Sequence, residues 1–260
     1  KALNKINAKD ILNLKKQYSH KSISYQNRIK SLISPIIDDA IINGDLEYNP
    51  LSFLKNEVAP SAQSISEKVI DNELEIAKKM YSKLINNEVQ YISDYHYRKY
   101  DTNEETNVLF ILMLMSVHRF GELLQLKKSD IYLDKIISPK EITKTNRPYE
   151  FPFPLEITKY VEKIENDALL FPTLNRSMVS VRFQKLIKSL NLTAIKNQSS
   201  ITPHDLRRIF TSILAKKRID INLIDFALEH KIKGVMSHYL HYTYEDKKEV
   251  FEKYWELIRE

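Results

Sequence analysis

Apolar residues recur every three or four positions along most of the chain, which is the spacing of helices that bury one face. The helical patterns cover residues 8–18, 23–42, 69–84, 107–117 and 121–127. Starts of later helices are signalled by Thr202-Pro203, by Asp220 and by residues 244–246. This pattern predicts a mainly α protein.

One region departs from the helical pattern. Residues 130–144 and 148–153 alternate apolar and polar side chains on either side of Asn146-Arg147. A period of two is typical of strands with one buried face. We therefore expect a short hairpin or a small antiparallel β-sheet here, followed by further helices.

A break in the pattern divides the chain into two parts. Asn49-Pro50 ends the first pair of helices, and the next stretch holds Pro60 among Ser, Ala and Gln residues, a composition typical of linkers. We predict a helical domain over residues 1–55, a linker over 56–66, and a mostly α domain over 67–260 that ends in a helix over 246–260.

Composition and charge narrow the classes of protein. The chain has 40 Lys and Arg against 34 Asp and Glu, and the net charge of +6 suits a polyanionic partner without requiring one. The absence of cysteine excludes disulfides, thiolate zinc sites and cysteine nucleophiles, and is compatible with a cytoplasmic location. The longest apolar run, residues 108–117, is too short to span a bilayer. The first residue, Lys1, is not methionine, which suggests that other residues precede it.

A His-x-x-Arg motif lies at a predicted helix start. Thr202 is the expected N-cap and Pro203 the first helical residue. His204 and Arg207 then share one helix face, where backbone N–H groups, a guanidinium and an imidazole can hold a phosphate. Taken alone, the motif is better explained as a capped surface helix.

A second candidate group follows the apolar helix that ends near residue 117. Arg119 stands at the end of this buried helix, where an unpaired charge would be costly. Glu122, three residues further on, can pair with the guanidinium and orient it. A purely structural Arg–Glu pair in a helix corner explains this segment equally well.

The third candidate group combines His230 with Tyr239, nine residues later. A tyrosine hydroxyl has a pKa of about 10, so it needs cationic neighbours to act as a nucleophile at neutral pH. The two arginines and two histidines named above can supply them. Alone, this segment fits a packed helical surface better than a catalytic one.

Together, these motifs resemble the tyrosine recombinase or phage integrase family in order and spacing. Arg119 to Leu123 matches the first arginine box, Arg-x-x-Glu-Leu, and His204 with Arg207 matches the second box. His230 matches the third-box histidine, and Tyr239 the nucleophile. The resemblance extends over essentially the whole chain, and residues 1–55 resemble the family's core-binding domain.

The match includes a lysine and two departures. The family's catalytic lysine lies in a β-hairpin between the first two boxes, where this chain has Lys144. Val117-His118 stands where the family often has Gly-Leu, and Glu229 where it often has Gly. Neither departure removes a reacting group.

The resemblance implies a mechanism that needs neither metal nor ATP. Tyr239 would attack the scissile phosphate and form a 3'-phosphotyrosyl link, while Arg119 and Arg207 bind the nonbridging oxygens. Lys144 would be the general acid for the leaving oxygen, His204 would assist proton transfer at Tyr239, and His230 would donate a hydrogen bond to the phosphate. No cofactor is expected.

The expected partner is a double-stranded DNA recombination site, clamped between the two domains. The candidate DNA contacts are Ser22, Ser24, Tyr25, Asn27, Arg28, Lys30 and Arg147. By resemblance, four subunits would assemble on two DNA sites through the helix over residues 246–260, and accessory DNA-binding proteins can assist. Packing of that helix on its own domain is the alternative.

Several alternatives stay open at this point. Tyr242 and Tyr244 lie close to Tyr239 but are better explained as packing residues. His118, His238 and His241 lack the spacing of a metal site. A type IB topoisomerase would use the same chemistry, and a DNA-binding protein without catalysis or an all-helical interaction protein are the other functional alternatives.

Overall fold

The computed structural model describes residues 5–52, 70, 72–91, 102–191, 201–230 and 241–260. The chain divides into two compact units, unit 1 (Lys1–Val69) and unit 2 (Ile70–Glu260). Both consist mainly of helices, and unit 2 adds a small antiparallel sheet, so the predicted fold class is confirmed. The predicted linker lies outside the described residues.

The described part of unit 1 contains two helices that pack around a small core. The first helix, α1 (Ala8–Gln17), begins with a capping box in which Asn7 and Asp10 bind each other's backbone N–H groups. The second, α2 (Ile23–Ile42), has the predicted bounds and is capped by the Ser22 hydroxyl. The buried core consists of Ile11, Ile37, Ala40, Leu46 and Leu51.

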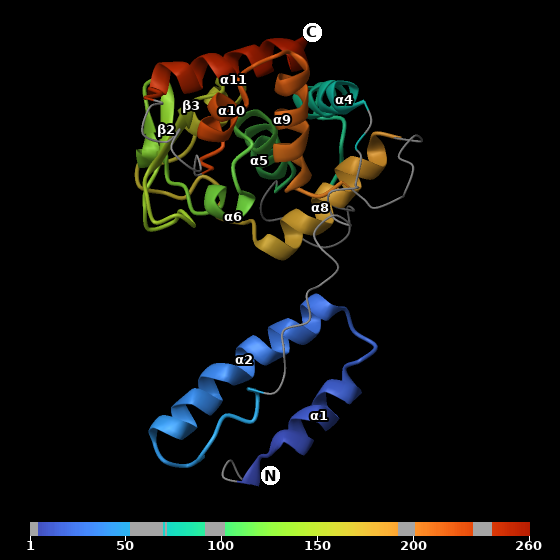
Figure 1. The fold of residues 1–260 in the computed structure, drawn as a ribbon. Coiled ribbons are helices and arrows are strands. Elements are labelled where there is room, and N and C mark those ends of the chain that lie inside the picture. The colour runs from blue at the N-terminus through green and yellow to red at the C-terminus, as the bar shows by residue number, and fades with distance from the viewer. Residues whose placement is uncertain (1–4, 53–69, 71, 92–101, 192–200, 231–240) are drawn as a thin grey trace. The chain divides into compact units, whose positions relative to one another are not determined.

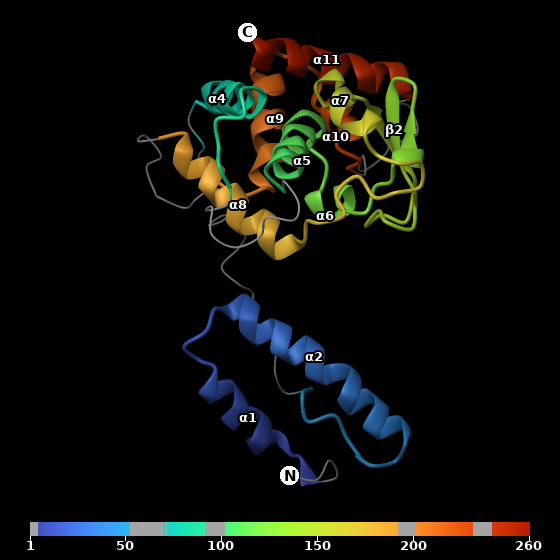
Figure 2. The same cartoon turned by 180° about the vertical axis from the view of Figure 1, so that it is seen from behind.

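Unit 2 is built around one helix that is buried on all sides. This helix, α5 (Thr102–Ser116), is buried at every residue from Glu105 to Ser116, as expected for a helix that is apolar all round. It lies at the centre of unit 2, with α4, α8 and α11 packed against it (Figures 1 and 2). No helix among the described residues is long and apolar enough to cross a membrane.

The other helices of unit 2 surround this centre. They are α4 (Glu73–Ile85), α6 (Phe120–Leu123), α7 (Thr158–Glu162), α8 (Arg176–Ser189), α9 (Asp205–Lys216), α10 (Ile221–Ala227) and α11 (Tyr244–Arg259), with the 3-10 helices η2 (Lys128–Asp130) and η3 (Leu155–Ile157). Asp220 caps α10 as predicted. Helix α9 begins at Asp205 with His204 as its N-cap, so the predicted start at Thr202-Pro203 was too early.

The sheet has three short antiparallel strands in the order β1-β2-β3. They are β1 (Ile131–Tyr132), β2 (Lys135–Ser138) and β3 (Tyr149–Pro152). Ser138 pairs with Tyr149, so residues 139–148 form a loop between β2 and β3. The alternating pattern had suggested a strand region as far as residue 144, but the pairing ends at Ser138.

The apolar stripe of α11 is buried in its own unit. Val250, Phe251, Tyr254, Trp255 and Ile258 are all buried there, and the Trp255 indole N–H donates to the Met115 carbonyl at 2.8 Å. The stripe therefore packs on its own domain, which is the alternative that the sequence left open.

Candidate functional site

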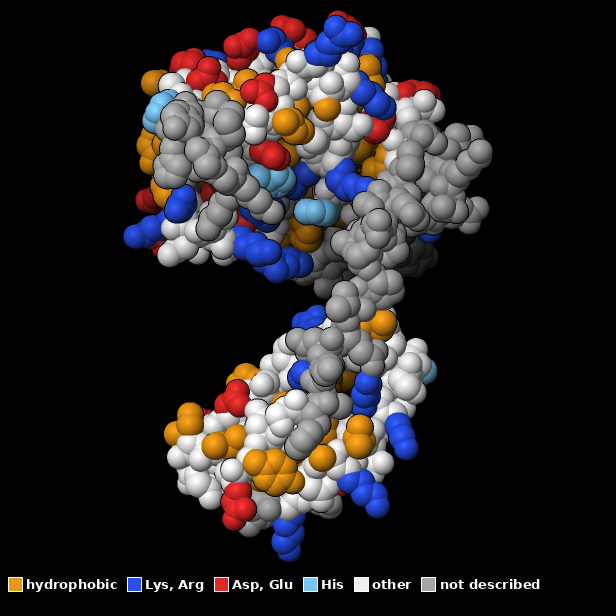
Figure 3. Space-filling view, in the orientation of Figure 1, with side chains coloured by type: hydrophobic (Ala, Val, Ile, Leu, Met, Phe, Trp, Pro, Cys, Tyr) orange, Lys and Arg blue, Asp and Glu red, His pale blue; other side chains and the backbone are white. Residues whose placement is uncertain are grey.

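Four of the predicted catalytic residues line one cleft in unit 2. The cleft has a volume of about 420 Å³ and lies between the α5–α6 corner, the β2–β3 loop, and the amino-terminal ends of α8 and α9. Arg119, Lys144, His204 and Arg207 all line it, together with Glu122. Lys, Arg and His side chains gather around this hollow in Figure 3. Segments far apart in sequence therefore place their cationic groups around one cavity.

Arg207 is the most firmly held of these cations. It lies on the buried face of α9 and is only 6% exposed. Its Nη1 donates to the Val117 carbonyl at 3.0 Å and its Nη2 donates to the Leu228 carbonyl. Burial lowers the pKa of the guanidinium, but arginine stays protonated at physiological pH. The side chain thus connects α9, the end of α5 and the end of α10.

Arg119 lies at the corner that follows α5. Val117 adopts a left-handed backbone conformation with φ of +46°, which turns the chain out of α5 and towards α6. The Arg119 Nη1 atom is 3.5 Å from Glu122 Oε1 and 3.8 Å from Glu229 Oε2. The predicted pairing with Glu122 is present, but it is long, and a second carboxylate shares the guanidinium.

Glu122 also joins the first box to the loop that carries Lys144. Its Oε1 accepts a hydrogen bond from the Lys144 backbone N–H at 2.9 Å, and its Oε2 lies 3.0 Å from His118 Nε2. Burial alone would raise the pKa of Glu122, but the hydrogen bonds from His118 and Lys144 lower it. The carboxylate therefore fixes the backbone of Lys144, whose side chain is exposed at the cleft.

His118 is buried at the edge of the core and lines the cleft. Its ring stacks on Tyr149 at 4.7 Å and on Phe151 at 5.2 Å, between centroids. Burial lowers the pKa of His118, which favours the neutral ring in spite of the nearby Glu122. His118 thus helps to hold the Glu122 carboxylate in place.

Of the two predicted histidines, His204 lines the cleft, whereas His230 is not among the described residues that line it. His204 is exposed at the start of α9, and its pKa is lowered by partial burial and by Arg207 and Arg119. The His230 Nδ1 atom is 2.9 Å from Asp225 Oδ1, and its Nε2 is 3.4 Å from Arg207 Nη2. Because a carboxylate only accepts, Nδ1 carries a proton and Nε2 faces the arginine.

Tyr239, the predicted nucleophile, lies outside the described residues, as does His238. The two neighbouring tyrosines are engaged elsewhere: the Tyr242 hydroxyl donates to Asp220 Oδ2 at 3.0 Å, and the Tyr244 hydroxyl to the Asp134 carbonyl at 3.4 Å. Burial and nearby carboxylates raise the pKa of both hydroxyls. Neither is poised to act as a nucleophile in this arrangement.

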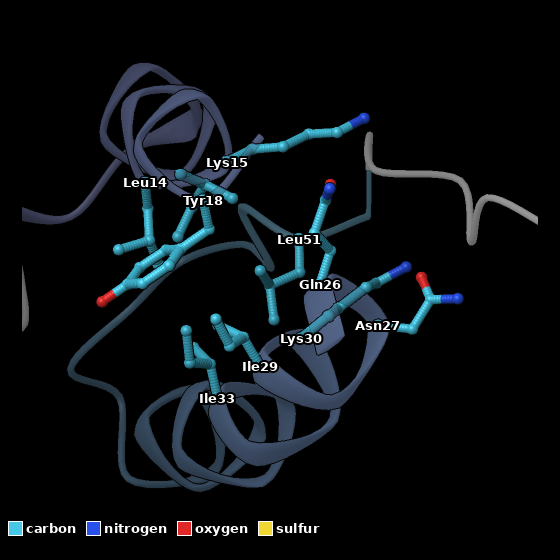
Figure 4. Close-up of a pocket in the computed structure, with 10 residues that line it drawn as sticks. Leu14, Lys15, Tyr18, Gln26, Asn27, Ile29, Lys30, Ile33 and Leu51 are labelled. Atoms are coloured by element: carbon cyan, nitrogen blue, oxygen red, sulfur yellow. The ribbon is translucent and has the colours of Figure 1, made fainter. Parts of the chain in front are cut away.

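The predicted DNA contacts of unit 1 lie around the start of α2. Ser22, Ser24, Tyr25 and Arg28 are exposed. Asn27 and Lys30 border a groove of about 50 Å³ between α1 and α2, and Figure 4 shows their polar ends directed away from its apolar floor. In unit 2, Arg147 is exposed in the β2–β3 loop. These positions leave the side chains accessible to a large ligand.

Two residues at the site were missed in the sequence. Arg176, at the start of α8, lines the cleft, and its guanidinium lies so close to Gly121 that a Cβ there would be 2.8 Å from Nη2. Glu229, noted only as a departure from the family, faces Arg119. No motif marks Arg176, because its approach to Gly121 depends on tertiary packing. In the part of the chain that the structure describes, no cluster of His, Asp or Glu forms a metal site.

Solved structures of similar fold include recombinases and an integrase in complex with DNA. One is the XerH site-specific recombinase bound to difH substrate in a pre-cleavage complex, with 18% identity, a TM-score of 0.60, and coverage of 94% of this chain and 69% of the other. The post-cleavage complex of XerH gives a TM-score of 0.61 at 18% identity, covering 98% and 71%. The Tn1549 transposon integrase with circular intermediate DNA gives 0.55 at 15% identity, covering 95% and 85%. These likenesses establish the fold.

Sequence comparison identifies the family. No curated protein sequence matches this chain. The model of the phage integrase family matches residues 82–246, which is more than half of the 260 residues and includes all three boxes. The resemblance expected from the motifs is thereby confirmed. This chain belongs to the phage integrase family, the tyrosine recombinases that cut and rejoin DNA.

Proposed function

We propose that the cleft of unit 2 binds one DNA phosphodiester, which Tyr239 attacks to form a 3'-phosphotyrosyl intermediate. The observation that carries this proposal is the convergence of Arg119, Lys144, His204 and Arg207 on a single cavity. A phosphodiester that is attacked gains negative charge on its nonbridging oxygens, and preorganised cationic donors stabilise that charge. The bond energy is kept in the phosphotyrosyl link, so a 5'-hydroxyl can reverse the step without ATP.

The arginines would bind the nonbridging oxygens from two directions. Arg207 has donors fixed by carbonyl groups, and its remaining donors can point into the cleft. Arg119 is 29% exposed at the opposite corner and can turn towards an anion. These two forks supply the electrostatic stabilisation that metal ions give in two-metal nucleases, so cleavage is expected to persist in excess EDTA.

Three other groups would handle protons and hydrogen bonds. Lys144 is the candidate general acid for the leaving 5'-oxygen, since Glu122 holds its backbone and leaves its ammonium free to reach the cleft. His204 would assist proton transfer at Tyr239. A protonated His230 ring would present its Nε2–H beside Arg207, while Asp225 stabilises the added charge at Nδ1.

Tyr239 is the preferred nucleophile among the neighbouring tyrosines. Its spacing from His230 matches the family, and the hydroxyls of Tyr242 and Tyr244 are bound to Asp220 and to the Asp134 carbonyl. Freeing either hydroxyl would require breaking a hydrogen bond, and each has a raised pKa. The engagement of these two hydroxyls favours Tyr239 as the nucleophile.

The partner would be a double-stranded recombination site contacted by both units. The exposed residues at the start of α2 and Arg147 are candidate phosphate contacts, and such contacts make binding weaken steeply with salt. The similar solved structures are described as complexes with DNA substrates. Assembly of four subunits on two sites, help from accessory proteins and a cytoplasmic location remain part of the proposal. Because the apolar stripe of α11 is covered by its own unit, contact between subunits through this helix would use its exposed, charged face.

The proposal is tested with a nicked suicide substrate that carries candidate sites. The full chain is expected to form a covalent protein–DNA adduct with and without EDTA. Tyr239→Phe should bind DNA as the wild type does and form no adduct, whereas Tyr242→Phe, the matched control, should still form it. An adduct that survives in Tyr239→Phe would contradict the proposal.

A further inference from the structure

Glu229 places a carboxylate beside one of the two arginines of the cleft. The residue follows α10 directly, next to His230, and its side chain is 17% exposed. Its Oε1 accepts a hydrogen bond from the Thr145 hydroxyl at 2.7 Å, in the loop that carries Lys144. Its Oε2 lies 3.8 Å from Arg119 Nη1. One carboxylate thus joins the third box, the lysine loop and the first arginine.

The backbone of Glu229 is in a conformation that favours glycine. Its φ is +60°, in the left-handed region that commonly follows the end of a helix. A side chain with a Cβ is strained there, and strain of this kind persists mainly where function or surrounding contacts maintain it. Among the described residues, Oε2 accepts no hydrogen bond although it is buried. The hydrogen bond from Thr145 therefore uses only Oε1, and Oε2 has Arg119 as its charged neighbour.

The carboxylate changes the charge that a ligand meets in the cleft. Arg119 and Arg207 contribute two positive charges, and Glu122 and Glu229 contribute two negative charges close to them. Glu122 is already engaged by His118 and the Lys144 backbone. Glu229 is the carboxylate whose second oxygen is left facing Arg119, in the manner of an anionic ligand.

We propose that Glu229 is a built-in competitor of the phosphodiester for Arg119. This inference rests on the proposed function, since it takes the cleft to be a phosphate site. In the free chain the Glu229 carboxylate neutralises Arg119, and a phosphate oxygen must replace it as the neighbour of Nη1. The residue would thereby hold down the affinity of the cleft for anions until DNA contacts elsewhere place a phosphodiester there.

The test uses Glu229→Gln, which removes the negative charge of the side chain and keeps its shape. In Glu229→Gln the amide oxygen can still accept from Thr145, so the loop should keep its position. The Arg119 Nε–Hε signal, assigned with Arg119→Lys, is followed by NMR in full-length chain with ¹⁵N-arginine as sulfate is added. We expect Glu229→Gln to bind sulfate about tenfold more tightly than the wild type, which corresponds to ~1.4 kcal/mol. Glu252→Gln, which makes the same charge change on the exposed face of α11, should bind as the wild type does.

A second measurement follows adduct formation on the suicide substrate. Under single-turnover conditions Glu229→Gln should form the adduct at least as fast as the wild type, and Glu229→Gly should do the same while being no less stable. Sulfate affinity that is unchanged or lower in Glu229→Gln, or no sulfate-dependent shift in either chain, would overturn the inference. So would a slower cleavage rate in Glu229→Gln, which would make the carboxylate a helper of catalysis. If no chain forms an adduct, the proposed function fails while the sulfate comparison still tests Glu229.

Discussion

The two arginines of the cleft are held in opposite ways. Arg207 is buried and donates to two backbone carbonyls, those of Val117 and Leu228. Arg119 is partly exposed and lies between two carboxylates, Glu122 and Glu229, at 3.5 and 3.8 Å. Carbonyl groups satisfy the donors of a guanidinium and leave its charge in place, whereas carboxylates also neutralise it. The Arg207 guanidinium is therefore held in one position with its positive charge in place. The charge of Arg119 is partly neutralised, and its side chain is adjustable.

Because of this difference, the two arginines should contribute unequally to the stability of the fold, although we propose that both act in cleavage. A buried arginine that connects three elements contributes to folding as well as to anion binding, because losing it leaves buried carbonyls without donors. An arginine at a corner with long contacts contributes little to folding. Substitutions at the two positions should accordingly have similar effects on cleavage and different effects on the free energy of unfolding.

The largest effect is expected at Arg207. Lysine lacks the planar fork through which Arg207 donates to the Val117 and Leu228 carbonyls from two different nitrogens. Arg207→Lys should slow adduct formation about 10²- to 10⁴-fold and lower the free energy of unfolding by about 2–4 kcal/mol. Single-turnover cleavage and urea denaturation measure the two quantities. Arg208→Lys, its half-buried neighbour, is the control and should change neither by much. Wild-type stability of Arg207→Lys would contradict the predicted difference between the two arginines.

At Arg119, substitution should slow adduct formation strongly but change the free energy of unfolding little. Arg119→Lys should slow adduct formation about 10²- to 10³-fold, because a point charge replaces the bidentate fork. The free energy of unfolding should change by less than about 1 kcal/mol, since the side chain is partly exposed and its ion pairs are long. The same two assays apply. A loss of stability as large as that of Arg207→Lys would show that the corner is not adjustable.

Lys247 tests what happens when a carbonyl-bound buried cation can lose its proton. Its Nζ donates to the Glu150 carbonyl at 2.9 Å and lies 4.4 Å from the Tyr149 ring centroid. Burial lowers the pKa of Lys247 to about 8. In the unfolded chain the pKa is about 10.4, so between these values the unfolded state binds more protons, and this group makes the protein more stable as pH rises.

Lys247→Met removes that dependence. The free energy of unfolding of Lys247→Met minus that of the wild type should fall by about 2–3 kcal/mol between pH 7 and pH 10. Urea denaturation at each pH measures both free energies. Lys248→Met is the control, because a hydrogen bond to Asp134 raises the pKa of Lys248 and its proton is kept throughout this range. A constant difference between Lys247→Met and the wild type would mean that Lys247 keeps its proton as well.

The smallest effect is expected at Arg176, the exposed cation at the rim. Arg176→Ala should weaken DNA binding about three- to tenfold and reduce the slope of log affinity against log salt by about one. Lys188→Ala, three turns further along α8, is the matched control and should leave the slope nearly unchanged. Equal slopes in the wild type and Arg176→Ala would place Arg176 outside the phosphate contacts.

Much of the fold follows from local pattern. Helix α2 has its predicted bounds because Ser22 caps a continuous apolar face, and α5 was recognisable as buried because it is apolar all round. The sheet was also expected, although not where it ends. Strand pairing stops at Ser138, and the loop beyond it is held by Thr143, which bonds to Arg147, and by Glu122, which binds the Lys144 backbone. A local alternation of apolar and polar residues does not predict a hydrogen bond between residues that are 22 positions apart.

The motifs of the site could be predicted from the sequence more fully than the arrangement of their side chains. Motif order placed Arg119, His204 and Arg207 together, and they do line one cleft. Neither the position of Arg176 against Gly121 nor a strained Glu229 facing Arg119 could be predicted from local pattern, because both depend on how separate helices pack. The role of Tyr239 and of the linker over residues 56–66 stays a prediction, since both lie outside the described residues.

The most direct test of the account is the structure of Tyr239→Phe assembled on its recombination site. We predict that the scissile phosphorus lies in the cleft, with both the Arg119 and Arg207 guanidiniums and the His230 Nε2 within hydrogen-bonding distance of its nonbridging oxygens. A bound complex in which no backbone phosphate enters the cleft, or in which these three groups contact different phosphates, would contradict it.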